Sequence, residues 1–101
     1  MVRPGITTDQ LDEALVQAAT ERKCYPSPLG YHGYPKSVCT SVNEVICHGI
    51  PDRRALKDGD IINIDVTLFH QGAFSLLTQV TTAICACNAD LQRDVHCWRA
   101  C

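Results

Sequence analysis

Residues 61–69 constrain the fold of this chain more than any other segment, because their polarity alternates from one position to the next. The apolar positions are Ile62, Ile64, Val66 and Leu68, and the polar positions between them are Asn63, Asp65 and Thr67. Successive side chains of a β-strand point to opposite faces of its sheet, so this pattern predicts a strand with one face on a core. The run from Lys57 to Asp60 contains Gly59 and two aspartates and predicts the turn before that strand.

Asp65 has two interpretations at this stage. A carboxylate on the polar face of an amphipathic strand is usually exposed to solvent. If that face were covered, hydrogen bonds or a cation would have to offset the cost of desolvating the charge, and a divalent metal ion is the commonest such partner.

A second amphipathic element lies near the N-terminus. Thr7 and Gln10 have the spacing of a capping box, and Asp9 favours a helix N-terminus. The apolar residues that follow recur at helical spacing: Leu11, Ala14, Leu15, Ala18 and Ala19. Polar residues lie mostly on the other side: Asp12, Glu13, Gln17 and Glu21. The sequence therefore predicts a helix that starts near Thr8 and packs by one face.

The segment Tyr25–Pro35 contains three prolines and two glycines, a composition that argues against regular structure and predicts a shaped loop. Its three tyrosines offer flat apolar surfaces with polar tips, which suit the wall of a pocket. The alternative is that these rings simply pin the loop to the domain surface. His32 is interpreted as an exposed loop histidine.

The segment Val38–Ile50 is rich in β-branched residues and is bounded by Pro35 and Pro51, so it predicts one strand or two short ones. His48 falls at the far end of that segment. A histidine at a strand end is usually structural, but a neutral imidazole beside a metal ion can also donate a hydrogen bond to a substrate carbonyl.

Composition limits the classes of function. The 101 residues, 46% of them hydrophobic, are enough for one domain with one core. The net charge is -2, and the charged residues are scattered, so we expect neither a nucleic acid nor a membrane as a partner. Long apolar runs and a signal-peptide pattern are missing, which predicts a soluble cytoplasmic chain.

The chain has seven cysteines, an odd number, and four of them lie in residues 85–101. This favours free thiols in a reducing compartment over a disulfide framework. Leu76–Ile84 has the composition of a further strand, and Asp90–Trp98 that of a weak helix. Cysteines and a histidine in the last segment have poor spacing for structural zinc, so we interpret them as fortuitous.

Three runs in register resemble the type I methionine aminopeptidases: Gly30–Cys39, Ser41–Asp52 and Asp58–Thr67. The resemblance covers roughly Val2 to Phe69, and Asn43–Arg54 is most similar to the eukaryotic cytosolic form. It implies an α/β fold, the N-terminal half of a pita-bread (creatinase/aminopeptidase-like) domain, with one amphipathic helix on an antiparallel β-sheet. It also implies metal-dependent removal of the N-terminal methionine of nascent polypeptides, with ribosome association in the family. The family uses two divalent ions per site, which are cobalt, manganese, iron(II) or zinc.

The resemblance also implies roles for single residues. Asp65 matches the first metal-binding aspartate, and His48 matches a histidine that contacts substrate near the scissile carbonyl. The wall of the methionine pocket is matched by Tyr31, Tyr34 and Cys39. Aromatic rings and a thiol suit a flexible, polarizable thioether.

Departures from the family pattern set further expectations. An ungapped alignment on Gly72 places Leu76 where the second metal-binding aspartate is expected, and the family's later histidine and two glutamates have no counterpart. We therefore expect a partial catalytic domain over 1–69 and a divergent, poorly defined tail over 70–101. Such a truncated chain, from a splice form or a defective gene model, is expected to be inactive by itself. The alternative is a non-catalytic peptide-binding or decoy module with half of the pita-bread fold.

Overall fold

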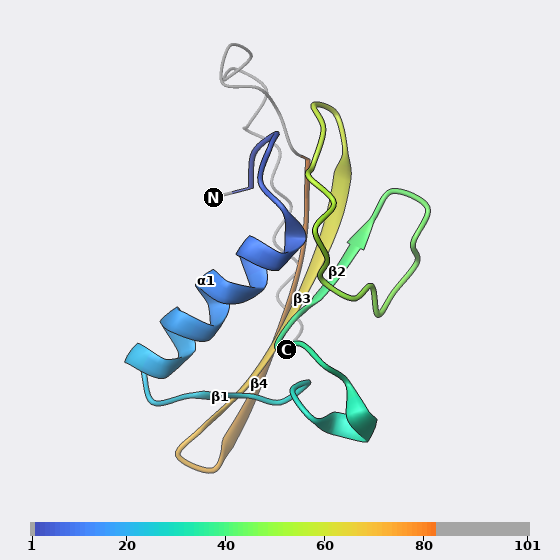
Figure 1. Ribbon diagram of the computed structural model, residues 1–101. Coiled ribbons are helices and arrows are strands. Elements are labelled where there is room, and N and C mark those ends of the chain that lie inside the picture. Colours follow the sequence, from blue (N-terminus) through green and yellow to red (C-terminus); the bar gives the residue numbers. More distant parts are fainter. Residues whose placement is uncertain (1, 83–101) are drawn as a thin grey trace.

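The computed structural model describes residues 2–82. Its elements in chain order are α1 (Thr8–Glu21), β1 (Tyr25–Pro26), the short 3-10 helix η1 (Tyr31–Gly33), β2 (Cys39–Val42), β3 (Ile61–His70) and β4 (Ala73–Thr82). Figure 1 shows α1 running alongside a sheet whose two longest strands, β3 and β4, cross the whole molecule. One helix on an antiparallel sheet is the predicted arrangement, and it is confirmed.

β3 is the central strand, and every other strand pairs with it in antiparallel orientation. β4 pairs with β3 along its entire length, so β1 and β2 share the opposite edge of β3. β2 pairs with its first half and β1 with its last residues. The chain therefore runs along this one edge of β3 twice, first as β1 and then as β2, before the long connection that follows β2.

The N-terminal helix begins as the sequence predicts. Thr7 caps it: the Gln10 amide donates to Thr7 Oγ1 at 3.2 Å, and the Thr7 amide donates to Gln10 Oε1 at 3.0 Å. Both bonds of the capping box are therefore present. The helix buries Leu11 against Leu56 and Ile62, and burial of each such side chain contributes roughly 1.5–3 kcal/mol. The core thus lies between α1 and the face of β3 that carries Ile62.

The loop prediction for residues 25–35 is wrong at two places. Tyr25 and Pro26 pair with Phe69 and Leu68, and a proline is tolerated there because β1 lies at the sheet edge. Residues 31–33 form a 3-10 turn that follows Gly30, a glycine in the left-handed conformation with φ 79°. The rest of the segment has no helix or strand.

The predicted strand after Val38 is real but short. β2 ends at Val42 because Asn43 adopts a left-handed conformation, with φ 53°, that asparagine tolerates better than most residues. The chain then folds back, and the Thr40 amide donates to the Gly49 carbonyl at 2.8 Å. His48 therefore lies in a loop beside β2 and not at the end of a strand.

The second half of the sheet is a hairpin. Gln71 and Gly72 have φ values of 48° and 82°, as a two-residue type I′ turn requires, and they join β3 directly to β4. A strand was predicted over residues 76–84, and β4 occupies Ala73–Thr82. The predicted weak helix and the last four cysteines lie outside the described residues, and the division of the chain at residue 69 stays a prediction.

Candidate functional site

The polar face of β3 points away from α1 and carries the candidate site. Cys39 on β2 stands directly opposite Asp65 on β3. Directly opposed residues of antiparallel strands project from the same face, with Cβ atoms about 4.5–5.5 Å apart. Cys39 is buried, at 8% exposure, and Asp65 is half-buried. The structure therefore brings a predicted pocket residue and the predicted metal ligand together on one partly covered surface.

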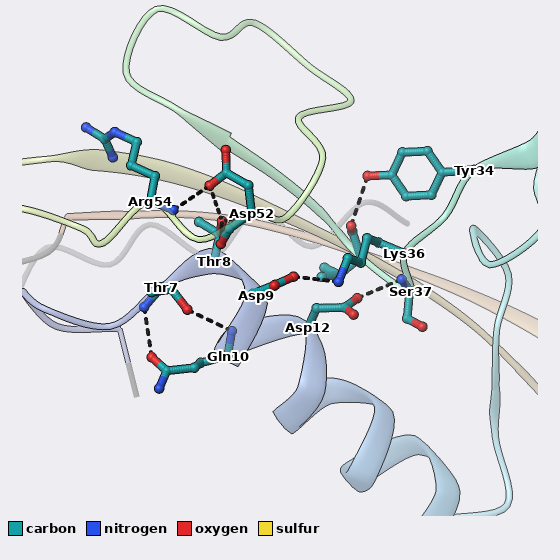
Figure 2. Close-up of polar contacts among 11 residues, drawn as sticks. Thr7, Thr8, Asp9, Gln10, Asp12, Tyr34, Lys36, Ser37, Asp52 and Arg54 are labelled. Atoms are coloured by element: carbon teal, nitrogen blue, oxygen red, sulfur yellow. Dashed lines mark hydrogen bonds and ion pairs between the residues drawn. The ribbon is translucent and has the colours of Figure 1, made fainter.

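Tyr34 stands over the same region. Its hydroxyl lies 3.0 Å from the carbonyl oxygens of Val38 and Gly49, and its single proton can be donated to one of them at a time. Figure 2 shows the ring at the end of the segment that leads into β2. The phenol thus ties the tyrosine-bearing loop both to the start of β2 and to the loop that contains His48.

The electrostatic surroundings of Tyr34 also link it to the site. Burial raises the pKa of its phenol far above the ordinary value of 10.0, and a hydrogen bond to Cys39 raises it further. Electrostatic interactions with Cys39, Asp12 and Asp65 raise the pKa of Tyr34 further. Tyr34 therefore stays a neutral hydrogen-bond donor at every physiological pH.

Gly49 fixes the position of the histidine loop. A Cβ at this residue would lie 2.2 Å from the Thr40 carbonyl oxygen, so only glycine allows the two backbones to approach this closely. The Gly49 amide donates to Ser41 Oγ at 3.2 Å, which closes a second contact with β2. The exposed His48, itself with φ 55°, is the residue immediately before Gly49. Its backbone is thus held at the rim of the surface that carries Cys39.

Tyr31 has a different environment from Tyr34. It is 69% exposed, and its ring packs edge-on against His32 with centroids 4.4 Å apart. His32 is exposed, as the sequence predicts. Of the three residues predicted to form the pocket wall, Cys39 is therefore buried, Tyr34 is half-buried and Tyr31 is exposed to solvent.

Sequence reasoning missed the contribution of α1. Asp12 was placed on the polar side of the helix, but it is only 7% exposed and accepts a hydrogen bond from the Ser37 amide at 2.7 Å. One turn earlier, Asp9 forms an ion pair with Lys36. Figure 2 shows both carboxylates directed at the segment between Tyr34 and β2. The helix therefore anchors the chain that presents both pocket residues.

A second anchor holds the chain beyond Gly49. The Asp52 amide donates to Thr8 Oγ1 at 2.8 Å, and the Asp9 amide donates to the Asp52 carbonyl at 2.9 Å (Figure 2). The Arg54 amide donates to Asp52 Oδ1 at 2.9 Å. The only sequence signal for this contact was the N-terminal position of Thr8, because a hydroxyl at a helix start is free to bond either its own helix or a distant loop.

The described residues do not by themselves fit a pair of metal ions. No three side chains among the His, Cys, Asp and Glu residues of positions 2–82 gather in a way that would hold one. Asn63 adds an amide oxygen on the face of Asp65; it is buried and has no hydrogen-bond partner within the described part of the chain. Position 76, where the resemblance places a second aspartate, stands opposite Thr67 and so belongs to the same face, but it is a leucine.

Comparison with known proteins identifies the family. Residues 1–98 match the model of metallopeptidase family M24. The chain belongs to this family. Methionine aminopeptidase 1 of Schizosaccharomyces pombe is 66% identical over 71 residues, which are 70% of this chain and 19% of that protein. Methionine aminopeptidase 1D, chloroplastic/mitochondrial, of Arabidopsis thaliana is 67% identical over 72 residues, which are 71% of this chain and 21% of that protein. The chain thus spans about a fifth of the length of these relatives.

Solved structures give the same result for the fold. The methionine aminopeptidase of Rickettsia prowazekii superimposes with a TM-score of 0.81 at 42% identity, over 83% of this chain and 34% of that one. The Thermotoga maritima enzyme gives 0.79 at 28% identity, over 82% and 34%. The resemblance to methionine aminopeptidases and the predicted α/β pita-bread fold class are confirmed. Within the described residues, no helix is long and apolar enough to cross a membrane.

The outcome for the predicted site residues is uneven. Tyr34, Cys39 and Asp65 come together, and the loop of His48 is held beside them through Gly49. Tyr31 is not drawn into this group. The roles assigned to all five predicted residues stay predictions, because overall similarity assigns no role to a single residue.

Proposed function

We propose that this chain forms the substrate-binding wall of a methionine aminopeptidase, an enzyme that removes the N-terminal methionine of nascent proteins. The observation that supports this proposal is the cross-strand pair of Cys39 and Asp65 with Tyr34 beside it. Tyr34 and Cys39, with Tyr31 from the adjoining turn, would hold the methionine side chain. An aromatic ring and a thiol offer the thioether polarizable contacts without hydrogen-bond demands.

His48 and Asp65 would act on the other end of the methionine residue. His48 is exposed at the rim, so its imidazole is free to donate a hydrogen bond to the scissile carbonyl of a bound peptide. Asp65 would be one ligand of the two divalent ions, cobalt, manganese, iron(II) or zinc, whose chemistry in such enzymes is to polarise the carbonyl and activate water. The described residues do not supply a complete set of ligands for these ions.

We propose that the isolated chain binds a peptide with N-terminal methionine but does not hydrolyse it. Cys39 lies opposite Asp65 with Tyr34 beside them, yet the described residues bring together no group of three metal-binding side chains. That contrast supports a second candidate function, a non-catalytic module that binds N-terminal methionine. The two candidates share the pocket and differ only in hydrolysis.

Two measurements on the purified 101-residue chain separate them. Binding of a fluorescent Met-Ala peptide is compared with that of an Ala-Ala peptide by anisotropy, and methionine release is followed with cobalt, manganese or iron(II). We expect a preference for the methionine peptide that falls in Cys39→Asp, which places a charge in the pocket, and no release above background. Equal binding of both peptides would show that the pocket assignment is wrong. Metal-dependent release would exclude the purely binding module.

We propose that the protein meets its substrate in the cytosol, where nascent chains leave the ribosome. Several relatives bear names that place them in organelles, among them the chloroplastic/mitochondrial protein of Arabidopsis thaliana and a mitochondrial one of Dictyostelium discoideum, so the compartment varies among similar proteins. Fractionation of cells that express the tagged chain tests the proposal. Recovery in the organelle fraction would refute it, and sedimentation with ribosomes would support a nascent-chain substrate.

A further inference from the structure

A cysteine and a histidine meet at the opposite end of β3 from the core. β1 and β3 pair Tyr25 with Phe69, and the next step of that ladder brings Cys24 beside His70. Cys24 Sγ lies 3.4 Å from His70 Nδ1. Their proximity follows from the backbone register and does not depend on one side-chain rotamer alone.

The pair is separate from the candidate site. His70 is five residues from Asp65, a rise of about 16 Å along a strand, and an odd separation places the two on opposite faces of the sheet. Asp65 shares its face with Cys39, whereas His70 lies on the face that packs against α1. The proposed peptidase chemistry therefore makes no use of either residue.

The position of Cys24 is set by the end of the helix. Its amide donates to the Ala19 carbonyl at 2.8 Å, and Lys23 before it adopts a left-handed conformation with φ 55°. The thiol has two acceptors within reach, the imidazole and the Arg22 carbonyl oxygen at 3.5 Å. A proton donated to His70 requires the tautomer in which Nδ1 is unprotonated and Nε2 carries the hydrogen.

We propose that Cys24 and His70 form a thiol-modification site for soft electrophiles. A thiol reacts as its thiolate, and a base within hydrogen-bond reach makes that form available at the moment of attack. With an alkyl halide, His70 Nδ1 takes the thiol proton, the sulfur electron pair forms the new S–C bond, and the carbon–halogen bond breaks to release halide. The product is a neutral thioether beside an imidazolium ion, which loses its proton to solvent.

Exposure and charge at the pair are compatible with attack from solvent. Cys24 is half-buried and His70 is exposed, so a small reagent reaches the sulfur while the ring stays beside it. The charged residues next to Cys24 in the chain are Arg22 and Lys23, both basic, and a cation near a thiolate stabilises it. The helix C-terminus has the opposite effect, and the Arg22 guanidinium donates to one of its last carbonyls, that of Ala18, at 3.0 Å.

The other described cysteines serve as internal references. Cys39 is buried in the candidate site, and Cys47 is exposed in the histidine loop. Steric access alone would make Cys47 react faster than Cys24. Activation by His70 predicts the reverse order.

The test is competitive alkylation with iodoacetamide at neutral pH, quantified for each cysteine by peptide mass spectrometry. In the parent chain we expect Cys24 to react faster than Cys47. The ratio of the two rates should fall at least about tenfold in His70→Asn, because a positioned base commonly contributes about 10²–10⁴-fold. His32→Asn, which changes another exposed histidine, is the matched control and should leave the ratio unchanged.

The same alkylation rates measured in the unfolded chain give a second test, and a local structural defect in His70→Asn would not reproduce its result. In concentrated urea the ratio of the two rates should be the same in the parent chain and in His70→Asn, because the imidazole is then no longer held beside the sulfur. Equal rates for folded parent and folded His70→Asn, with circular dichroism showing both folded, would overturn the proposal. So would a difference in that ratio between the two chains that persists in urea.

Discussion

Cys39 and Asp65 face each other across neighbouring antiparallel strands, on the side of the sheet that α1 does not cover. This single pairing joins the proposed methionine pocket to the proposed metal ligand. Their placement depends on the register of β2 against β3, and the loop that returns along β2 is hydrogen-bonded to that strand at Thr40 and Ser41. The first prediction concerns that loop.

Gly49→Ala should unfold the histidine loop from β2. The new methyl group would lie 2.2 Å from the Thr40 carbonyl oxygen, so one of the two backbones has to move, at a cost of roughly 1–3 kcal/mol. Urea denaturation measures the loss of stability, and hydrogen exchange at the Thr40 amide, which donates to Gly49, locates it. Gly72→Ala is the control: its Cβ would meet nothing within 4 Å, and the strain of alanine at φ 82° is local to the β3–β4 turn. Thr40 exchange should therefore stay slow in Gly72→Ala even though the turn itself is destabilised. Unchanged exchange in Gly49→Ala would contradict the close approach.

Asp12→Ala should loosen the segment that presents Tyr34. The substitution leaves the buried Ser37 amide without its acceptor, which costs about 1–3 kcal/mol. It also removes a negative charge that raises the pKa of Tyr34, so the phenol should titrate at lower pH than in the parent chain.

Ultraviolet difference absorbance of the phenolate measures this titration, and Tyr34→Phe assigns the signal among the three tyrosines. Glu13→Gln, a neighbouring exposed position on α1, is the control for a general effect of charge. Asp12→Asn keeps an oxygen acceptor for Ser37 and loses the charge, so it separates the two effects. A Tyr34 titration that is the same in all four chains that retain this tyrosine would refute the link between helix and pocket.

Asp60 should give the chain an acid-dependent component of stability. Its carboxylate accepts hydrogen bonds from Asn43 Nδ2 and the Lys57 amide and is paired with Arg54, and these contacts lower its pKa well below the ordinary 3.8. A carboxyl group whose folded-state pKa is depressed stabilises the fold above its unfolded pKa, and the contribution disappears as pH falls below 3.8 toward the folded value.

Urea denaturation between about pH 5 and about pH 2 should therefore show a steeper loss of stability in the parent chain than in Asp60→Asn, which has no carboxylate to protonate at this position. Glu44→Gln, at an exposed position of the adjoining loop, should keep the slope of the parent chain. If Asp60→Asn and the parent chain lost stability in parallel, the contacts of Asp60 would not be the cause.

Local patterns predicted the elements whose cause is local. The capping box at Thr7 and the alternation through Asp65 each depend on neighbours a few residues away, and both features are present. The end of β2 was not predictable in the same way, because the left-handed Asn43 is held by its side-chain bonds to Asp60 and to the Ile61 amide. Those partners are distant in sequence.

The same distinction between local and distant causes applies to the candidate site. Period two placed Asp65 on a polar face, but spacing alone gave no reason to join it to Cys39 or Tyr34, and only the family resemblance did so. The sequence analysis wrongly placed Asp12 on the polar side of the helix, because a helix that packs on a sheet buries more of its surface than the positions of its apolar residues indicate. A buried carboxylate needs a partner, and here that partner is the backbone amide of Ser37, which no residue pattern encodes.

The last prediction concerns a second carboxylate. Position 76 stands opposite Thr67, on the face of β3 that carries Asp65, so Leu76→Asp would place two carboxylates on one surface. Affinity for a divalent ion rises with the number of charged ligands, and calorimetry with manganese should therefore detect tighter binding. Gln79→Asp is the control, because position 79 stands opposite Ile64 on the other face.

Methionine release from a Met-Ala peptide should nevertheless stay at background in Leu76→Asp, with cobalt, manganese or iron(II). Loss of one oxyanion-stabilising contact commonly costs about 3–4 kcal/mol of barrier, and among the described residues the site would still lack a third side chain able to complete the coordination of an ion. Tighter metal binding without turnover would show that Asp65 is a ligand and that the remaining ligands decide catalysis. Release that starts on addition of metal and stops in Asp65→Asn would show instead that other residues complete the site.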